Sequence, residues 1–168
     1  IVVFAGEAFV QLPITADRSA AKLFLNAVNT NSVGTQGTAI GAAIDMARES
    51  FDVESPGSKA IIVITDGENH EDDAEGAARK AAEAGIVVHT IGMGTPEGGP
   101  IPAKRNGQIT GFRKDQQGNT VVSRLNETML ERIAAEGKGL YVRATSTSSG
   151  MEQLVADLRA LNTSEKGS

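Results

Sequence analysis

Two nearly continuous runs of branched apolar residues constrain the fold more than any other feature. "KAIIVIT" covers residues 59–65 and "IVVHTI" covers residues 86–91. Both runs are short and rich in Ile and Val, as expected of strands. A run with so few polar positions is typical of a parallel sheet that helices cover on both faces. Residues 1–4 and 140–144 are predicted as further strands, and residues 8–12 follow the first strand closely enough to form an antiparallel hairpin with it.

Segments with helical spacing lie between these runs. Asp17 can cap a first helix, carboxylates open the helix that ends near Gly85, and Asn126 and Gly137 bracket another. The apolar faces are formed by Leu23, Phe24, Ala27 and Val28, by Ile40, Ile44, Ala47 and Phe51, and by Met151, Leu154, Val155, Leu158 and Leu161. This alternation predicts an α/β fold: a doubly wound, mostly parallel sheet with helices on both faces and one antiparallel edge strand.

One stretch interrupts the alternation. Residues 95–125 hold three of the five prolines and several glycines, with "QITGFRK" and "NTVVSRL" on either side of "DQQG". We expect a loop followed by a β-hairpin insertion in which these two segments pair. A length of 168 residues suits a single domain, placed at residues 1–162, and residues 163–168 resemble the start of a solvated linker.

Composition excludes several classes of function. A net charge of −5 disfavours nucleic-acid phosphates and anionic lipid headgroups as partners. The absence of Cys excludes disulfides, a thiolate nucleophile and Cys-ligated metals. The sequence contains no run of about 18 apolar residues, so no membrane span is predicted. The first residues also lack the pattern of a signal peptide.

Polar residues gather where two elements meet the predicted ligand-binding edge of the sheet. Asp66 ends a strand within "ITDGENHEDD", and "GTQGT" opens a helix with Thr35, Gln36 and Thr38. The carboxyl ends of parallel strands and the amino ends of the following helices meet at one edge. Hydroxyl and carboxylate oxygens suit Mg²⁺, whereas zinc is disfavoured because the two histidines, His70 and His89, are far apart in sequence.

Simpler explanations exist for the same residues. "TDG" is a common exit from a strand, and Thr38 in "GTQGT" could act only as a helix cap. His89, within an apolar strand, is expected to be a core histidine with a hydrogen-bond partner. Residues 71–73 are expected to favour the dipole of the helix that follows them.

Three stretches together, "VITDGEN", "QGTAIGAAI" and "VVFAGEAFVQLPIT", resemble a von Willebrand factor A-type domain of the Bacteroides aerotolerance (Bat) group. The resemblance covers nearly the whole chain. It implies a metal-ion-dependent adhesion site in which Thr38 and Asp66 are ligands of Mg²⁺. Glu68 and Asn69 would then support these ligands or form the rim of the site.

The chain departs from this family in one element. No Asp-x-Ser-x-Ser sequence precedes Thr38, so the resemblance implies that the family's first strand, with its motif, is missing. Binding of Mg²⁺ is expected to be weak or absent with so few ligands. In the family that strand lies between those matching residues 1–4 and 59–65, so two strand edges are expected to be open, to be filled by another copy or by rearrangement.

The function implied by the resemblance is a non-enzymatic protein–protein interaction module that binds an acidic side chain of its partner through Mg²⁺. One alternative is a metal-independent scaffold or oligomerisation domain that uses the hairpin over residues 108–125. Another is a Mg²⁺-dependent hydrolase that uses Asp66 and His70, although no nucleophile elbow or phosphate loop occurs. Bat-type proteins carry membrane helices beside this domain, which implies a bacterial inner-membrane protein with the domain on its periplasmic side.

Overall fold

The computed structural model describes residues 1–28, 37–52, 54, 56–68, 72–144 and 150–157. Its centre is a parallel sheet of three strands in the order β3 (Lys59–Thr65), β4 (Ile86–Gly92) and β9 (Lys138–Arg143). β3 and β4 pair in register from Lys59 opposite Ile86 to Thr65 opposite Gly92. The prediction of a parallel α/β sheet is confirmed.

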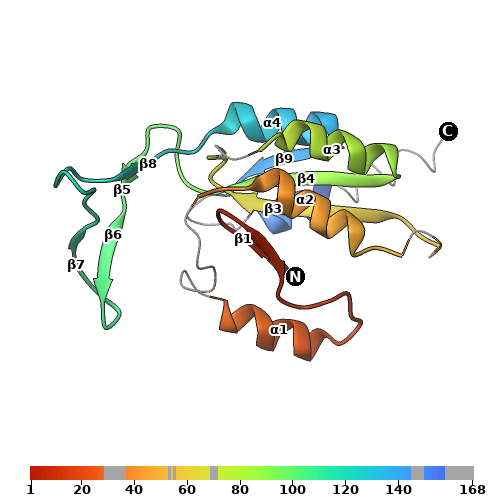
Figure 1. The fold of residues 1–168 in the computed structure, drawn as a ribbon, viewed down its shortest axis with the longest axis horizontal. Coiled ribbons are helices and arrows are strands. Elements are labelled where there is room, and N and C mark those ends of the chain that lie inside the picture. The colour runs from red at the N-terminus through yellow and green to blue at the C-terminus, as the bar shows by residue number, and fades with distance from the viewer. Residues whose placement is uncertain (29–36, 53, 55, 69–71, 145–149, 158–168) are drawn as a thin grey trace.

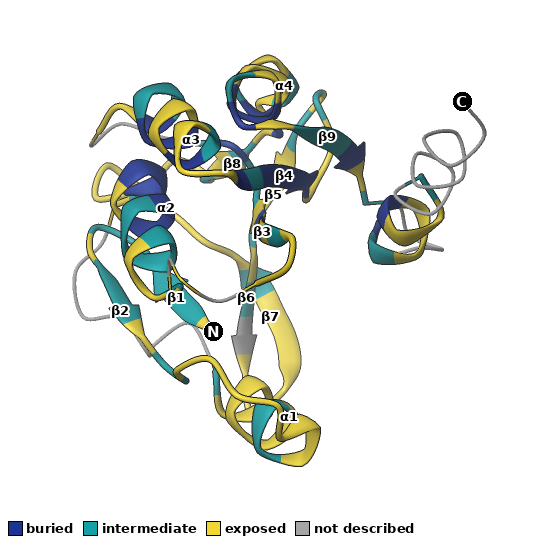
Figure 2. Ribbon diagram, turned by 90° about the vertical axis from the view of Figure 1, so that its right-hand side faces the viewer, coloured by how far each residue is buried: buried dark blue, intermediate teal, exposed yellow. Residues whose placement is uncertain are grey.

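Helices cover both faces of this sheet, but unequally (Figures 1 and 2). α2 (Ile40–Glu49), α3 (Ala74–Glu83) and α4 (Glu127–Glu136) form one layer, with the larger core between them and the sheet. On the other face, a helical segment over residues 151–157 packs Leu154 against Ile91 and Val142. The small side chains of α3 allow this close packing, because Ala74, Ala77, Ala78 and Ala81 are its buried residues.

The amino-terminal elements stand beside the sheet without joining it. β1 (Val2–Phe4) and β2 (Ala8–Val10) form the predicted antiparallel hairpin. α1 (Arg18–Ala27) begins at Asp17 as predicted, since the Asp17 carboxylate accepts hydrogen bonds from the backbone N–H groups of Ser19 and Ala20. The expected apolar face of α1 is not packed, because none of the residues of this helix is buried.

β3 differs from the expectation that both of its faces would be covered. Ile61 and Val63 are buried beneath the helices, but Ile62 and Ile64 point the other way and are 39% and 51% exposed. Among the described residues, β3 pairs with β4 alone and β1 pairs with β2 alone. Residues of both strands, including Phe4 of β1 and Ile62 and Ile64 of β3, line one groove.

The insertion also pairs differently from the prediction. β6 (Pro102–Arg105) and β7 (Gln108–Phe112) form a hairpin around Asn106 and Gly107, which both have positive φ angles. Residues of "QITGFRK" thus pair mainly with the segment before them. "DQQG" does form a turn, but the flanking segments share only the Lys114–Thr120 bridge and a few backbone hydrogen bonds. Two further short strands, β5 (Gly99–Pro100) and β8 (Val122–Ser123), pair at the base of the insertion.

Candidate functional site

The loop before α2 places Thr38 beside the end of β1. The backbone N–H of Ala39 donates a hydrogen bond of 2.7 Å to the carbonyl oxygen of Ala5, which directly follows β1. Ala39 is the N-cap residue of α2 and has no side chain that could satisfy the free N–H groups of the first turn. Thr38 is half-buried at this junction. The hydrogen bond of its neighbour Ala39 therefore places Thr38 beside the carboxyl end of β1.

The missing cap of α2 comes from the acidic loop after β3. The Asp72 carboxylate accepts hydrogen bonds from the backbone N–H groups of Gly41 (2.9 Å) and Ala42 (2.6 Å). Asp72 therefore caps α2, a role that the sequence did not predict. Asp73 does serve the following helix, since its carboxylate accepts a 2.8 Å hydrogen bond from Gly76 in α3. Glu71 lies outside the described residues.

Asp66 follows β3, and the structure holds its carboxylate from two sides. One oxygen, Oδ1, accepts a 3.1 Å hydrogen bond from the backbone N–H of Glu68. The other, Oδ2, accepts a 3.1 Å hydrogen bond from the hydroxyl of Ser123. Ser123 is 57 residues away in the sequence, and no motif around it predicted this contact. The carboxylate is thus oriented by one local and one distant donor.

Gly67 shows why the turn after Asp66 requires glycine. Its φ is +80°, and a Cβ atom at this position would lie 2.7 Å from the carbonyl oxygen of Asn126. In the same place, the backbone N–H of Asn126 donates a 2.7 Å hydrogen bond to the carbonyl oxygen of Asp66. The chain after β3 is therefore held tightly against the start of α4, and the strand-exit explanation of "TDG" accounts for part of this geometry.

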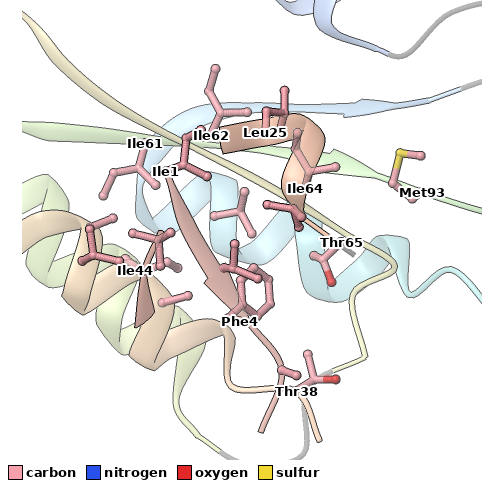
Figure 3. Close-up of a pocket in the computed structure, with 18 of the residues that line it drawn as sticks. Ile1, Phe4, Leu25, Thr38, Ile44, Ile61, Ile62, Ile64, Thr65 and Met93 are labelled. Atoms are coloured by element: carbon pink, nitrogen blue, oxygen red, sulfur yellow. The ribbon is translucent and has the colours of Figure 1, made fainter. Parts of the chain in front are cut away.

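A groove of about 940 Å³ lies between β1 and β3 and reaches both polar positions. Its walls are mostly apolar and include Phe4, Leu25, Ile44, Ile62 and Ile64 (Figure 3). Thr38, Asp66 and Ser123 also line it. Thr38 and Asp66 each adjoin the carboxyl end of one bordering strand, and both line this groove. The structure thus brings the two sequence-predicted ligands to a shared cavity.

The chemistry of these donors suits a hard cation, but the donors are few. Hydroxyl and carboxylate oxygens are the ligands that Mg²⁺ takes, and Mg²⁺ requires octahedral coordination. Across the residues with described positions, no group of three Asp, Glu or His side chains is arranged to hold a metal ion. Thr38, Asp66 and Ser123 together therefore fit part of a magnesium site.

The structure describes only some of the other residues that the sequence placed near the site. Glu68 is half-buried beside Asp66 and contributes the backbone N–H noted above. Asn69 and His70, like Thr35 and Gln36, lie outside the described residues, so the structure does not test a pairing of Asp66 with His70. No helix within the described ranges is long and apolar enough to cross a membrane.

His89 has the structural role that the sequence predicted. It is only 3% exposed, and its Nδ1 atom accepts a 3.0 Å hydrogen bond from the backbone N–H of Leu140. Burial lowers the pKa of His89 below its ordinary value. The imidazole therefore links β4 to β9 in its neutral form, and His89 does not line the groove.

Comparison with solved structures identifies close relatives. An aerotolerance-related membrane protein from Bacteroides fragilis NCTC 9343, with multiple mutations to serines, is 45% identical and superposes with a TM-score of 0.84, covering 95% of this chain and 77% of that chain. The conserved hypothetical protein BatB from Bacteroides thetaiotaomicron is 48% identical with a TM-score of 0.83, covering 95% and 78%.

A more distant structure supports the fold alone. Proximal thread matrix protein 1 from the mussel byssus, described with a zinc-occupied MIDAS motif, is 19% identical with a TM-score of 0.59, covering 95% of this chain and 32% of that chain. No curated protein sequence matched the chain. The family model described as the von Willebrand factor type A domain matches residues 1–157. The chain therefore belongs to the von Willebrand factor type A domain family.

Proposed function

We propose that this domain is a non-enzymatic protein–protein interaction module that holds Mg²⁺ at the end of the groove and presents it to an acidic side chain of a partner. The observation that carries this proposal is that Thr38 and Asp66 line the same groove, beside the carboxyl ends of β1 and β3. Membership of a family of interaction domains supports the general class of function. We add to this general class the binding of Mg²⁺ and of an acidic side chain of a partner.

The orientation of the Asp66 carboxylate supports its role as a ligand. Each of its oxygens accepts one hydrogen bond, from Glu68 N–H or from the Ser123 hydroxyl. A carboxylate offers about four lone-pair positions, so both oxygens retain acceptor capacity for a cation. Ser123 and Glu68 would hold the ligand in place, and Asn69 would contribute to the rim.

The groove suggests where the remaining ligands come from. β1 and β3 both end at the polar end, and their facing edges are open within the described part of the sheet. An extended apolar segment that lay between them, parallel to both, could add backbone hydrogen bonds on both sides. Its carboxyl end would then lie beside Thr38 and Asp66. A second copy or another polypeptide segment would complete both the sheet and the coordination of Mg²⁺.

Calorimetric titration with MgCl₂ tests the metal directly. The wild-type chain is compared with Asp66→Asn and Thr38→Val, and with Asp115→Asn as a control carboxylate in the insertion. Each titration is repeated with a synthetic β-branched peptide that carries carboxylate and hydroxyl side chains near its carboxyl end. We expect the peptide to strengthen Mg²⁺ binding in the wild type and in Asp115→Asn but not in Asp66→Asn.

The outcomes separate the proposal from its alternative. Ser123→Ala should weaken any binding by at least about tenfold, because residues that orient ligands typically contribute this much. If no Mg²⁺ binds with or without the peptide, or if Asp66→Asn binds as the wild type does, the metal-dependent reading fails. A metal-independent scaffold domain would then be the better description.

The cellular setting of this function is also part of the proposal. One relative is described as an aerotolerance-related membrane protein. By this likeness we assign the domain to a bacterial membrane protein, with the domain on the periplasmic side of the inner membrane. Protease treatment of spheroplasts that express the whole natural protein would test this orientation, since a cytoplasmic domain would stay protected.

A further inference from the structure

The insertion forms an arm, defined here as residues 99–124, that projects from the body of the domain (Figure 1). The arm holds the β6–β7 hairpin, with β5 and β8 at its base. None of these strands belongs to the three-stranded sheet. The backbone of the arm is held mainly by its own hydrogen bonds, such as Arg113 N–H to Ile101 O (2.8 Å) and Val121 N–H to Arg113 O (2.8 Å). The arm is therefore an ordered element with little support from the core.

Apolar side chains on the arm are exposed. Ile109, Phe112 and Val122 are 63%, 52% and 48% exposed. A two-stranded hairpin is only marginally stable alone in water and gains stability when another element covers its apolar face. Single exposed apolar residues need no explanation, but Ile109 and Phe112 on the β6–β7 hairpin and Val122 on β8 at its base are three within one short insertion, which indicates a contact surface.

The charge of the arm is opposite to that of the rest of the chain. It contains five Lys and Arg residues and one Asp, which leaves 11 basic and 20 acidic residues elsewhere. The single acidic residue, Asp115, is engaged locally, because its carboxylate accepts hydrogen bonds from the backbone N–H groups of Gln117 and Asn119. Among the described residues, Arg105, Arg113 and Arg124 form no ion pair. The arm thus carries a net charge of +4, and its three arginines form no ion pair within the described part of the chain.

We infer that the arm docks an extended acidic segment of a partner protein in which carboxylates alternate with apolar side chains. The carboxylates would contact the arginines of the arm, and the apolar side chains would cover Ile109 and Phe112. A short acidic segment can contact the arm alone. A large polyanion such as a nucleic acid or an anionic bilayer would also face the acidic body and be repelled by it. The arm meets the Mg²⁺ site proposed above at Ser123, at its base, whereas Arg105, Ile109, Phe112 and Arg113 do not line the groove.

Fluorescence anisotropy with labelled peptides tests the arm as a docking surface. The probes are a peptide of alternating Glu and Val and a peptide of alternating Lys and Val, with EDTA present so that the metal site does not contribute. We expect the Glu/Val peptide to bind and the Lys/Val peptide not to bind. Binding should weaken as NaCl is added, because exposed charges are screened by salt.

Matched variants locate the binding. Arg105→Gln with Arg113→Gln should weaken binding by about fivefold, as expected when two exposed ion pairs are lost. Arg18→Gln with Lys22→Gln, two exposed cations of α1, changes the net charge equally and should bind like the wild type. Ile109→Ser with Phe112→Ser should also weaken binding, and circular dichroism of each variant checks that the domain is folded.

Several outcomes would overturn this inference. Failure of the Glu/Val peptide to bind would do so, as would an equal loss of binding in both pairs of charge variants. Binding of the chain to phosphatidylglycerol vesicles that only the arm variants abolish would indicate a lipid surface instead. Light scattering could also show self-association that the arm variants abolish, and the occupant would then be a second copy.

Discussion

The carboxylate of Asp72 caps the helix that begins at Ile40, by accepting hydrogen bonds from the backbone of Gly41 at 2.9 Å and of Ala42 at 2.6 Å. Asp72 is 31 residues from Gly41, so this contact joins the loop after β3 to the loop that carries Thr38. A Cβ atom on Gly41 would lie 2.9 Å from the Asp72 carboxylate. The absence of a side chain on Gly41 thus allows this close approach, and both polar loops of the groove are held together.

Removal of the Asp72 carboxylate should destabilise the domain. Asp72→Ala leaves the N–H groups of Gly41 and Ala42 without their acceptor, and loss of a helix cap costs about 0.5–2 kcal/mol in the free energy of unfolding. Asp72→Asn, which keeps one acceptor oxygen, should cost less. Urea unfolding measures both, with Glu97→Gln as the control at an exposed carboxylate. Equal stability of Asp72→Ala and the wild type would show that the cap contributes nothing.

Gly67→Ala should destabilise the domain more than Gly85→Ala. The two glycines have similar φ angles, +80° and +76°, but only at Gly67 would a Cβ atom meet backbone, namely Asn126 O at 2.7 Å. A left-handed conformation costs a non-glycine residue about 1–2 kcal/mol, and Gly67→Ala adds a steric clash to that cost. Chemical denaturation of the two variants isolates the clash. If both lose the same stability, the close approach of Gly67 to α4 is not rigid.

Adjacent isoleucines of β3 should respond differently to truncation. Ile61 is 7% exposed and Ile62 is 39% exposed. Ile61→Ala should cost about 2–5 kcal/mol of unfolding free energy, as expected for a buried isoleucine. Ile62→Ala should cost less than about 1 kcal/mol while the groove is open. Urea unfolding at several protein concentrations checks this contrast, and a large, concentration-dependent loss for Ile62→Ala would mean that a second copy fills the groove.

Stability should fall as the pH drops below 6.5 because of His89. Burial lowers the pKa of folded His89 below its ordinary value of 6.5, so the unfolded chain takes up the proton first. The stability that neutral His89 contributes is complete above pH 6.5 and is lost as the pH falls towards the folded pKa. The loss is at most about 1.4 kcal/mol per pH unit.

Unfolding of the wild type and of His89→Gln at pH 7.5 and pH 5.5 measures this effect. The difference between the two pH values should shrink in His89→Gln, which cannot titrate. His70→Gln replaces the other histidine of the chain. Comparison of the two variants shows which histidine causes the change in unfolding free energy with pH. If His89→Gln has the same dependence of unfolding free energy on pH as the wild type, another group causes that dependence.

Local patterns in the sequence were sufficient for the elements and for several of their ends. The Ile- and Val-rich runs predicted β3 and β4, and the caps at Asp17, Asp73 and Asn126 all form as side-chain hydrogen bonds. Such signals act between residues a few positions apart, so the sequence shows them directly. The dipeptide Asn106–Gly107 was an equally local signal for a hairpin turn, and the pairing of β7 with β6 could have been predicted from it.

Only the tertiary structure decided how distant segments meet. Nothing in the acidic loop showed that Asp72 would cap α2 while Asp73 caps α3, and nothing around Ser123 showed its hydrogen bond to Asp66. The Ile/Val run of β3 also gave no sign that Ile62 and Ile64 would remain uncovered. The sequence by itself determined the strands of the sheet, the helices that cover it, and Thr38 and Asp66 as candidate ligands. Their meeting at one groove depends on the packing of elements many residues apart, which short-range patterns do not encode.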